Sequence, residues 1–331
     1  MPSRFFCVLF AAGVALAADP QLLNLLPPDS KVLGGVDFAA SRHTPFGDYV
    51  LGKLEQHAGE IDRFAAETGI DPRNGLLSMV MGGTGVGRDS DGAATFRGNF
   101  QRDSLLQYAA SKGAQVLTYA GAPMIVGRHE RSPALAFPLP DVGIFGSRER
   151  VQAALERWRA AITLDAEVRA RADGLSAGKH GWFLLLGSPA ELAGRLPQNS
   201  MGGAMRGDLV KAIEEMSGTI LFGQEVEMEG QIVAADAESA KALANVIQFF
   251  VSFAQLGGDD ETAAIVARFF ANMQLTTSGN KVNVTLRVAE ADFEAALERF
   301  HPRRPHGVGN NGNRSGGEGR RGRPSRSGAG R

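Results

Sequence analysis

The sequence has 331 residues, a net charge of −1 at pH 7 and one cysteine, Cys7, which excludes an intramolecular disulfide and any site built from several cysteines. The near-zero charge hides an asymmetry, because the segment Pro302–Arg331 carries +7 while Ala18–His301 carries about −9. An acidic body with a basic tail argues against a nucleic-acid groove on the folded part.

The first 17 residues predict a secretory signal peptide. Arg4 supplies the positive charge, Phe5–Ala17 is apolar, and Ala15-Leu16-Ala17 has the small-x-small pattern of a cleavage point. The apolar run is too short for an ordinary transmembrane helix. Cys7 lies inside this run and not at the cleavage point, so it does not resemble the lipid-accepting cysteine of a lipoprotein. We therefore expect export to the periplasm or the cell exterior, a mature chain without cysteine, and no transmembrane segment in it.

The first half predicts short strands separated by helices. Lys31–Phe38 is the first expected strand. Thr44 as N-cap and Pro45 at the first helical position begin a helix that Gly69 ends. The apolar face of this helix is Phe46, Val50, Leu54, Ala58, Ile61 and Ala65. The later expected strands are Leu76–Met81, Ala93–Phe100, Val116–Tyr119, Met124–Gly127, Ala134–Pro138 and Val142–Gly146, with helices over Gln101–Lys112 and from Ser147 onward.

The second half repeats this order. Val226–Ala234 alternates apolar and polar residues, which is typical of a strand with one dry face, and Asp236 is placed to cap the following helix. The other predicted strands are Trp182–Gly187, Thr219–Gly223 and a hairpin of Gln274–Ser278 with Lys281–Val288. The predicted helices are a region closing over Gly207–Met216, the segments from Asp236 to Gly258 and from Asp259 to Met273, and Ala291–Phe300.

These patterns predict an α+β fold of two tandem related domains, each an antiparallel sheet with helices packed on one face. The expected boundaries are 1–17 for the signal peptide, 18–172 for the first domain, 173–301 for the second and 302–331 for a tail. The Ala-, Gly- and Ser-rich segment Arg171–Gly181 is the expected break.

The segment Ala242–Gly258 is uncharged but too short and too polar for a membrane span, so we expect a helix laid across a sheet. Phe249 lies beside its neutral polar stripe. An apolar groove between the sheets would be lined by Phe249, Phe253, Phe269 and Phe270.

Short segments of the sequence match known catalytic motifs, but the residues or elements around them differ from what each motif requires. Gly174–Gly178 fits the G-x-S-x-G pattern around Ser176, but a nucleophile elbow needs a strand before the serine and a helix after it, and the order here is reversed. Gly82–Asp89 resembles a P-loop but has Arg88 where the phosphate-binding lysine should stand. No histidine pair has zinc-site spacing. The sequence predicts no catalytic residues, no metal ligands and no cofactor.

The tail Pro302–Arg331 is rich in Gly and Arg and lacks the apolar residues that a packed structure needs, which predicts disorder. It could contact a polyanionic surface through charge alone, with Arg320, Arg321, Arg323 and Arg326 as the anion contacts. The alternative is a solubilising tail with no specific partner.

Three segments give the chain a resemblance to exported bacterial proteins with a duplicated α+β domain and no known activity. They are Thr68–Arg73, Ala237–Leu243 and Gly279–Leu286. The resemblance spans most of 28–300 and supports the duplicated architecture, but it implies no functional residues.

The leading functional hypothesis is therefore an exported, non-catalytic binding or envelope-associated protein. The alternatives are a hydrolase whose site is assembled from distant residues, and a carrier of an apolar ligand. The sequence does not identify the ligand, the oligomeric state or the relative placement of the domains.

Overall fold

A computed structural model describes residues 18–85, 91–129, 132–189, 211–256 and 261–300. The strands are β1 Val32–Asp37, β2 Leu76–Gly83, β3 Gly92–Gly98, β4 Gln115–Tyr119, β5 Ala122–Val126, β6 Ala134–Leu139, β7 Val142–Gly146, β8 Gly181–Leu186, β9 Ile213–Leu221, β10 Glu225–Ala234, β11 Gln274–Ser278 and β12 Lys281–Ala289. The helices are α1 Pro20–Leu23, α2 Phe38–Ser41, α3 Pro45–Glu55, α4 Ala58–Thr68, α5 Arg102–Ser111, α6 Arg148–Arg159, α7 Ala166–Ser176, α10 Ala237–Leu256, α11 Glu261–Phe270 and α12 Glu290–Phe300.

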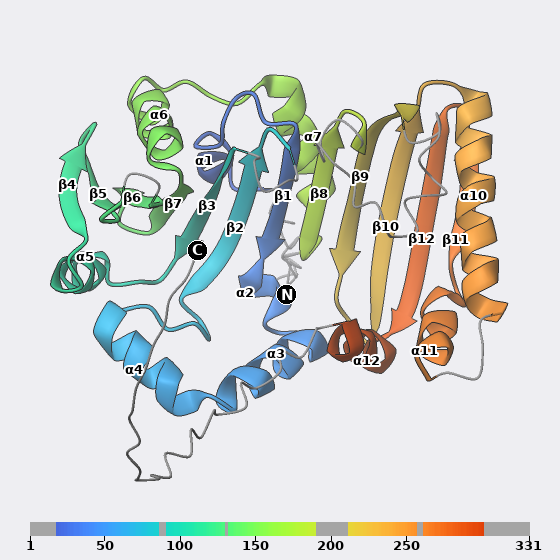
Figure 1. The fold of residues 1–331 in the computed structure, drawn as a ribbon, viewed down its shortest axis with the longest axis horizontal. Coiled ribbons are helices and arrows are strands. Elements are labelled where there is room, and N and C mark those ends of the chain that lie inside the picture. Colours follow the sequence, from blue (N-terminus) through green and yellow to red (C-terminus); the bar gives the residue numbers. More distant parts are fainter. Residues whose placement is uncertain (1–17, 86–90, 130–131, 190–210, 257–260, 301–331) are drawn as a thin grey trace, which may run out of the picture.

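The described strands form one 12-stranded sheet in the order β11-β12-β10-β9-β8-β1-β2-β3-β7-β6-β5-β4 (Figure 1). Every neighbouring pair is antiparallel, which confirms the α+β class and the predicted antiparallel pairing. The sequence predicts two sheets, but β1 and β8 pair along Val32–Val36 and Gly181–Leu185 and join the halves into one.

The core of the first half lies between the sheet and helices α1, α6 and α7. Leu33 of β1 and its cross-strand partner Leu184 of β8 belong to one buried cluster with Leu22 of α1, Val151 of α6 and Ala172 of α7. In α1 and the turn after it, Leu22, Leu23, Leu25 and Leu26 are all at most 1% exposed. This short segment is therefore a wedge that completes the core.

The second half packs its helix α10 on the opposite face of the same sheet. Met216 of β9 and Ile232 of β10 are cross-strand partners, and both pack with Leu243 of α10. Met216 also pairs with Leu185, whose side chain points away from the face occupied by Leu184, because successive residues of a strand alternate. Helices α1, α6 and α7 thus pack on one face of the sheet and α10 packs on the other.

This change of face leaves an apolar row exposed in the first half. Phe183, Gly34, Met81, Ala94 and Phe145 are successive cross-strand partners on the face opposite α1, α6 and α7. Phe183 is 41% exposed, and Met81 and Phe145 are each 47% exposed.

The helix signals in the sequence correspond to real caps. Thr44 Oγ1 accepts a hydrogen bond from Gly47 N at 3.1 Å, and Asp236 Oδ1 accepts one from Ser239 N at 2.7 Å. Gly69 ends α4 with a left-handed φ of 73°.

Three boundaries differ from the predictions. The helix expected from Thr44 to Gly69 is two helices, α3 and α4, which are separated at Gln56 and His57. Ile213–Met216, expected to close a helix, begins β9 instead, because it pairs with β8 and β10. Arg171–Ser176 is the last part of α7 and not a linker, so the predicted domain boundary at residue 173 falls inside a helix.

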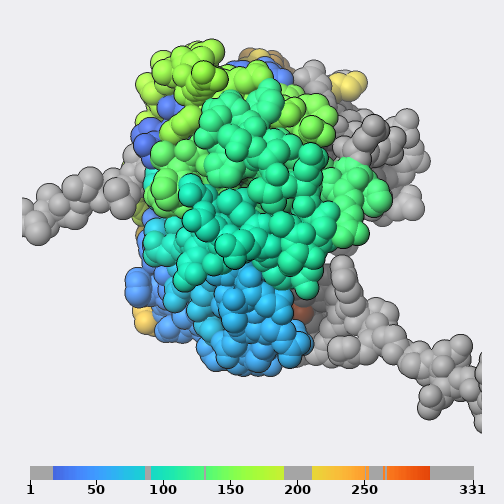
Figure 2. All heavy atoms as spheres, turned by 90° about the vertical axis from the view of Figure 1, so that its left-hand side faces the viewer, coloured from blue at the N-terminus to red at the C-terminus, as the bar shows by residue number. Residues whose placement is uncertain are grey.

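At the β4 end of the sheet, α4 packs against α5. Figure 2 looks onto this end and shows the blue atoms of α4 directly below the green atoms of the segment around β4–β7. The helix pair α3–α4 therefore runs along the lower edge of the sheet, from β4 toward the second half (Figure 1).

Candidate functional site

A cavity of about 390 Å³ lies where α3 crosses the lower end of β1, β8 and β9. Its floor is a cross-strand row of Val36, Gly181 and Ile220. A Cβ atom added to Gly181 would lie 2.8 Å from Ile220 Cγ2, so the missing side chain leaves part of the cavity open. The floor belongs to the same face as the exposed apolar row, two residues further along β1.

The roof is α3, which is held close to α2 by a glycine. Pro45 and the Thr44 cap fix the start of α3. A Cβ atom on Gly47 would lie 2.4 Å from Ser41 O and 2.5 Å from Arg42 O, so only glycine lets the two segments approach this closely. The apolar stripe that the sequence assigns to this helix supplies Phe46, Val50 and Leu54 to the cavity.

An aromatic cluster closes the end of the cavity nearest the second half. The rings of Phe46 and Phe222 stack with centroids 4.3 Å apart, and Phe293 of α12 packs edge-on against Phe46 at 5.5 Å. Lys53 Nζ of α3 lies 2.6 Å from Glu298 Oε1 of α12. Thus α12, which belongs to the second half, supports one wall of a cavity that the first half mainly builds.

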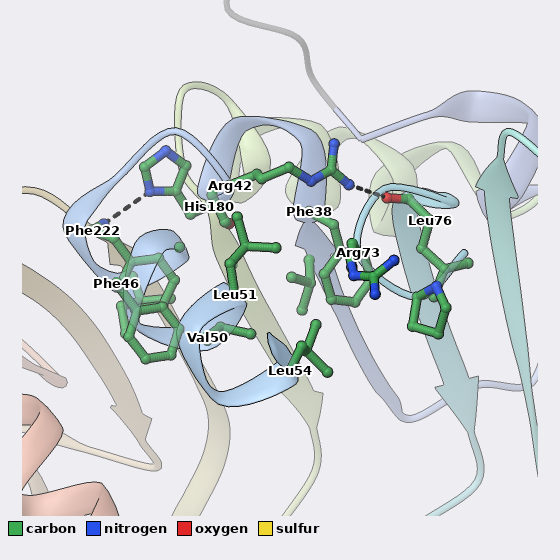
Figure 3. Close-up of a pocket in the computed structure, with 16 residues that line it drawn as sticks. Phe38, Arg42, Phe46, Val50, Leu51, Leu54, Arg73, Leu76, His180 and Phe222 are labelled. Carbon is green, nitrogen blue, oxygen red and sulfur yellow. Dashed lines mark hydrogen bonds between the residues drawn. The ribbon is translucent and has the colours of Figure 1, made fainter. Parts of the chain in front are cut away.

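The lining of the cavity is mostly carbon, with few polar groups (Figure 3). Its volume lies in the range of small-molecule sites, about 300–1,000 Å³. The lining residues are Val36, Phe38, Ser41, Arg42, Phe46, Gly47, Val50, Leu51, Leu54, Pro72, Arg73, Leu76, His180, Gly181, Ile220 and Phe222. The basic side chains among them decide which ligands the cavity can accept.

Arg73 is already neutralised by carboxylates. Its guanidinium donates to Asp62 Oδ1 at 2.7 Å, and Glu55 and Asp71 also lie within ion-pair distance at 3.2 and 3.5 Å. The hydrogen bond to Asp62 raises the pKa of Arg73, so it stays charged. With three carboxylates around one cation, Arg73 has no positive charge left for an anionic ligand.

Arg42 has a different environment. Its Nη2 donates to Leu76 O at 3.0 Å, and among the described residues no carboxylate forms an ion pair with it. A guanidinium has five N–H donors, so most of its hydrogen-bonding capacity is unused by described protein groups. Figure 3 shows Arg42 on the same side of the cavity as His180, across from Val50 and Leu54.

His180 is neutral at pH 7. Burial lowers its pKa, and the nearby Asp37 carboxylate offsets this only in part. Its Nδ1 accepts a hydrogen bond from Phe222 N at 2.9 Å, which assigns the ring proton to Nε2. The ring also lies parallel to that of Phe222 at 5.7 Å. His180 therefore fixes the aromatic wall and adds no second positive charge.

Three of the four phenylalanines predicted to line a groove are described, and none of these three lines this cavity. Phe249 is 66% exposed on α10. Phe269 and Phe270 pack against each other on α11, and Phe269 stacks on Phe293 at 6.4 Å. The side chain of Phe253 and the tail residues Arg320, Arg321, Arg323 and Arg326 lie outside the described part of the structure, so their predicted roles stay predictions.

Ser176, the serine of the G-x-S-x-G pattern, has a structural role. It ends α7 and is 6% exposed, and its Oγ donates to Ala172 O at 2.7 Å. Within the described ranges, no group of three or more His, Cys, Asp or Glu side chains could hold a metal ion. The same ranges contain no helix that is long and apolar enough to cross a membrane.

Comparison with known proteins gives only distant likenesses. No protein family and no curated protein matches the sequence. Among solved structures, crystal form IV of the bacterial protein TP0453 aligns over 86% of this chain and 97% of its own, with 12% identity and a TM-score of 0.49. Crystal form III of the same protein gives 12% identity and a TM-score of 0.48 over 86% of this chain and 99% of its own.

Proposed function

We propose that this protein is an exported, non-catalytic binding protein whose ligand is a single-chain amphiphile with one anionic head group. The ligand's apolar body occupies the cavity beneath α3, and its head group pairs with Arg42. The observation that carries this proposal is the combination of an almost entirely apolar lining with one cation that no described carboxylate neutralises.

The chemistry of the lining favours both parts of such a ligand. Each buried methylene contributes about 0.8 kcal/mol, or about fourfold in affinity. A hydrogen bond between the anionic head group and Arg42 would contribute about 1.5–3 kcal/mol, as is usual for hydrogen bonds to charged groups. Val50 is 39% exposed, so the cavity has an open side through which a chain can enter.

A titration series tests the proposal. Octanoate, decanoate and dodecanoate should bind with affinities that rise about fourfold per added methylene until the cavity is filled. The methyl esters of the same acids should bind about ten- to a hundredfold more weakly, because they lack the charge that pairs with Arg42. Calorimetry or protein-detected NMR gives the constants.

Variants separate the site from general hydrophobic adsorption. Arg42→Gln should weaken the acids but not the esters, whereas Gly181→Leu should weaken both by filling the floor. Arg63→Gln on the exposed side of α4 is the matched control for loss of a positive charge. Equal affinity of acids and esters would reject the pairing with Arg42, and no effect of Gly181→Leu would show that the cavity is not the binding site.

Envelope association through the basic tail is a separate proposal, motivated by the charge of Pro302–Arg331. Deleting the tail should abolish a salt-sensitive attachment to anionic vesicles and leave cavity binding unchanged. Vesicle binding that survives the deletion would reject this role.

We also propose that the two halves arose by duplication. The strand order β1-β2-β3-β7-β6 in the first half corresponds to β8-β9-β10-β12-β11 in the second, which supports this origin. In each half, a three-strand meander pairs with the second strand of a later hairpin. Separate expression of the two halves tests whether either folds as a domain.

A further inference from the structure

The backbone of Ala18 is buried at the last turn of α7. Its N atom donates a hydrogen bond to Ser176 Oγ at 2.6 Å, and the two residues are 7% and 6% exposed. Ser176 Oγ in turn lies 2.7 Å from Ala172 O and 3.2 Å from Asp173 O, two carbonyls in that turn. The Ala18 nitrogen is therefore placed beside the C-terminal end of a helix.

The residues that follow hold Ala18 in place. Asp19 Oδ1 caps α1 by accepting from Gln21 N at 2.9 Å, and Asp19 Oδ2 lies 2.6 Å from Arg97 Nε. Leu22 then enters the core completely. A movement of Ala18 would therefore disturb α1 and the buried leucines of residues 22–26 that complete this core.

Charged groups of both signs surround Ala18. Lys179 and Arg97 line the same cavity, but Lys179 Nζ is paired with Glu229 at 2.9 Å and Arg97 Nε with Asp19 at 2.6 Å, so these two cations are already neutralised. The carbonyl end of a helix carries a partial negative charge, and the last turn of α7 contains no basic residue. Asp173 lies in this turn, three residues before Ser176, and its Oδ1 is buried with no hydrogen-bond partner among the described residues. A buried carboxylate oxygen without a partner is costly. A peptide N–H at Ala18 has one proton and no charge, so it cannot neutralise that carboxylate.

We propose that the chain is processed between Ala17 and Ala18, and that the new α-ammonium group of Ala18 is a structural cation bound by Ser176 Oγ at the C-terminal end of α7, with the Asp173 carboxylate as its counter-ion. An export endopeptidase would catalyse the addition of water across this peptide bond. Ala17 then leaves with a carboxylate, and the amine of Ala18 takes up a proton. The Ala15-Leu16-Ala17 pattern places the same bond at the cleavage point.

The first experiment locates the terminus. The full-length gene is expressed for export, and the mass and amino-terminal sequence of the exported protein are measured. The proposal predicts a chain that begins at Ala18. A chain that begins at any other residue overturns it.

The second experiment tests the ammonium itself. A fusion cleaved to leave Ala18 as the first residue is compared with the same chain extended by Gly-Ser, which converts the ammonium to an amide. The extension should lower Tm by about 2–4 °C at pH 7. This difference should shrink above about pH 8–9, where the α-amine loses its proton. Equal Tm values for the two chains would overturn the proposal.

A double-mutant cycle assigns the counter-ion. Asp173→Asn should lower the Tm of the free-terminus chain more than that of the extended chain, because only the former has an ammonium for Asp173 to pair with. Glu67→Gln on the exposed face of α4 should lower both equally and is the control for loss of a negative charge. An Asp173→Asn effect that is the same in both chains removes Asp173 as the partner and overturns this assignment.

Discussion

A single methyl group added at Gly47 should separate α3 from α2 and open the candidate site. In the Gly47→Ala variant, the new Cβ would lie 2.4 Å from Ser41 O and 2.5 Å from Arg42 O, about 1 Å closer than ordinary contact. Both atoms belong to the backbone, so α3 must move. Overpacking of this kind costs about 1–3 kcal/mol. The movement would also weaken the stacking of Phe46 on Phe222.

Gly52 provides the matched control, because it lies in the same helix and nothing is within 4 Å of its Cβ position. Alanine is favoured over glycine in a helix interior by about 1 kcal/mol, so Gly52→Ala should stabilise the protein. Urea unfolding followed by circular dichroism should therefore separate the variants by roughly 2–4 kcal/mol. The reasoning is refuted if Gly47→Ala is as stable as Gly52→Ala.

Three further predictions concern the core and two titrating groups. Leu22→Ala should lower the free energy of unfolding by about 3–5 kcal/mol in urea, because it leaves a hole in the completely buried wedge. Burial lowers the pKa of His180 in the folded protein, so its contribution to stability is present above pH 6.5 and is lost as pH falls further; His180→Asn should reduce that loss between pH 7 and pH 5, measured as Tm. Burial and Glu294 raise the pKa of Glu290 to about 7, so the protonated carboxyl stabilises the folded protein below its ordinary pKa of 4.5, and this stabilisation is lost as pH rises to 7. Glu290→Gln should therefore remove a fall in Tm between pH 5 and pH 7. An unchanged dependence of Tm on pH in His180→Asn or in Glu290→Gln would show that the substituted residue does not have the shifted pKa.

Local signals in the sequence predict most elements because their causes are local. The Thr44 and Asp236 caps and the Gly69 terminator act within one helical turn. The pairing of β1 with β8 joins residues almost 150 positions apart, and no local pattern encodes it. This pairing makes one sheet of the two that the sequence predicts.

The helix boundaries that were missed have specific reasons. No glycine or proline marks the break between α3 and α4 at Gln56 and His57. Ile213 and Met216 are spaced as on a helix, but β9 is fixed by strands on both sides, and tertiary pairing overrides the local pattern.

The cavity could be predicted only in part. The sequence assigns Phe46, Val50 and Leu54 to one apolar helix face, and these residues line the roof. It places the groove instead among the phenylalanines of α10 and α11, because aromatic residues are densest there. Nothing in the sequence marks Arg42. Its importance comes from its place in the cavity and from having no carboxylate partner among the described residues, and both are properties of the folded structure.

Native mass spectrometry of the protein exported to a bacterial periplasm and purified without detergent tests the central claim most directly. The account predicts a reproducible extra mass of an anionic amphiphile on the wild-type protein and on Arg63→Gln. That mass should be reduced in Arg42→Gln and absent in Gly181→Leu. A wild-type protein that carries no such mass, and takes up none from added dodecanoate, would contradict the account.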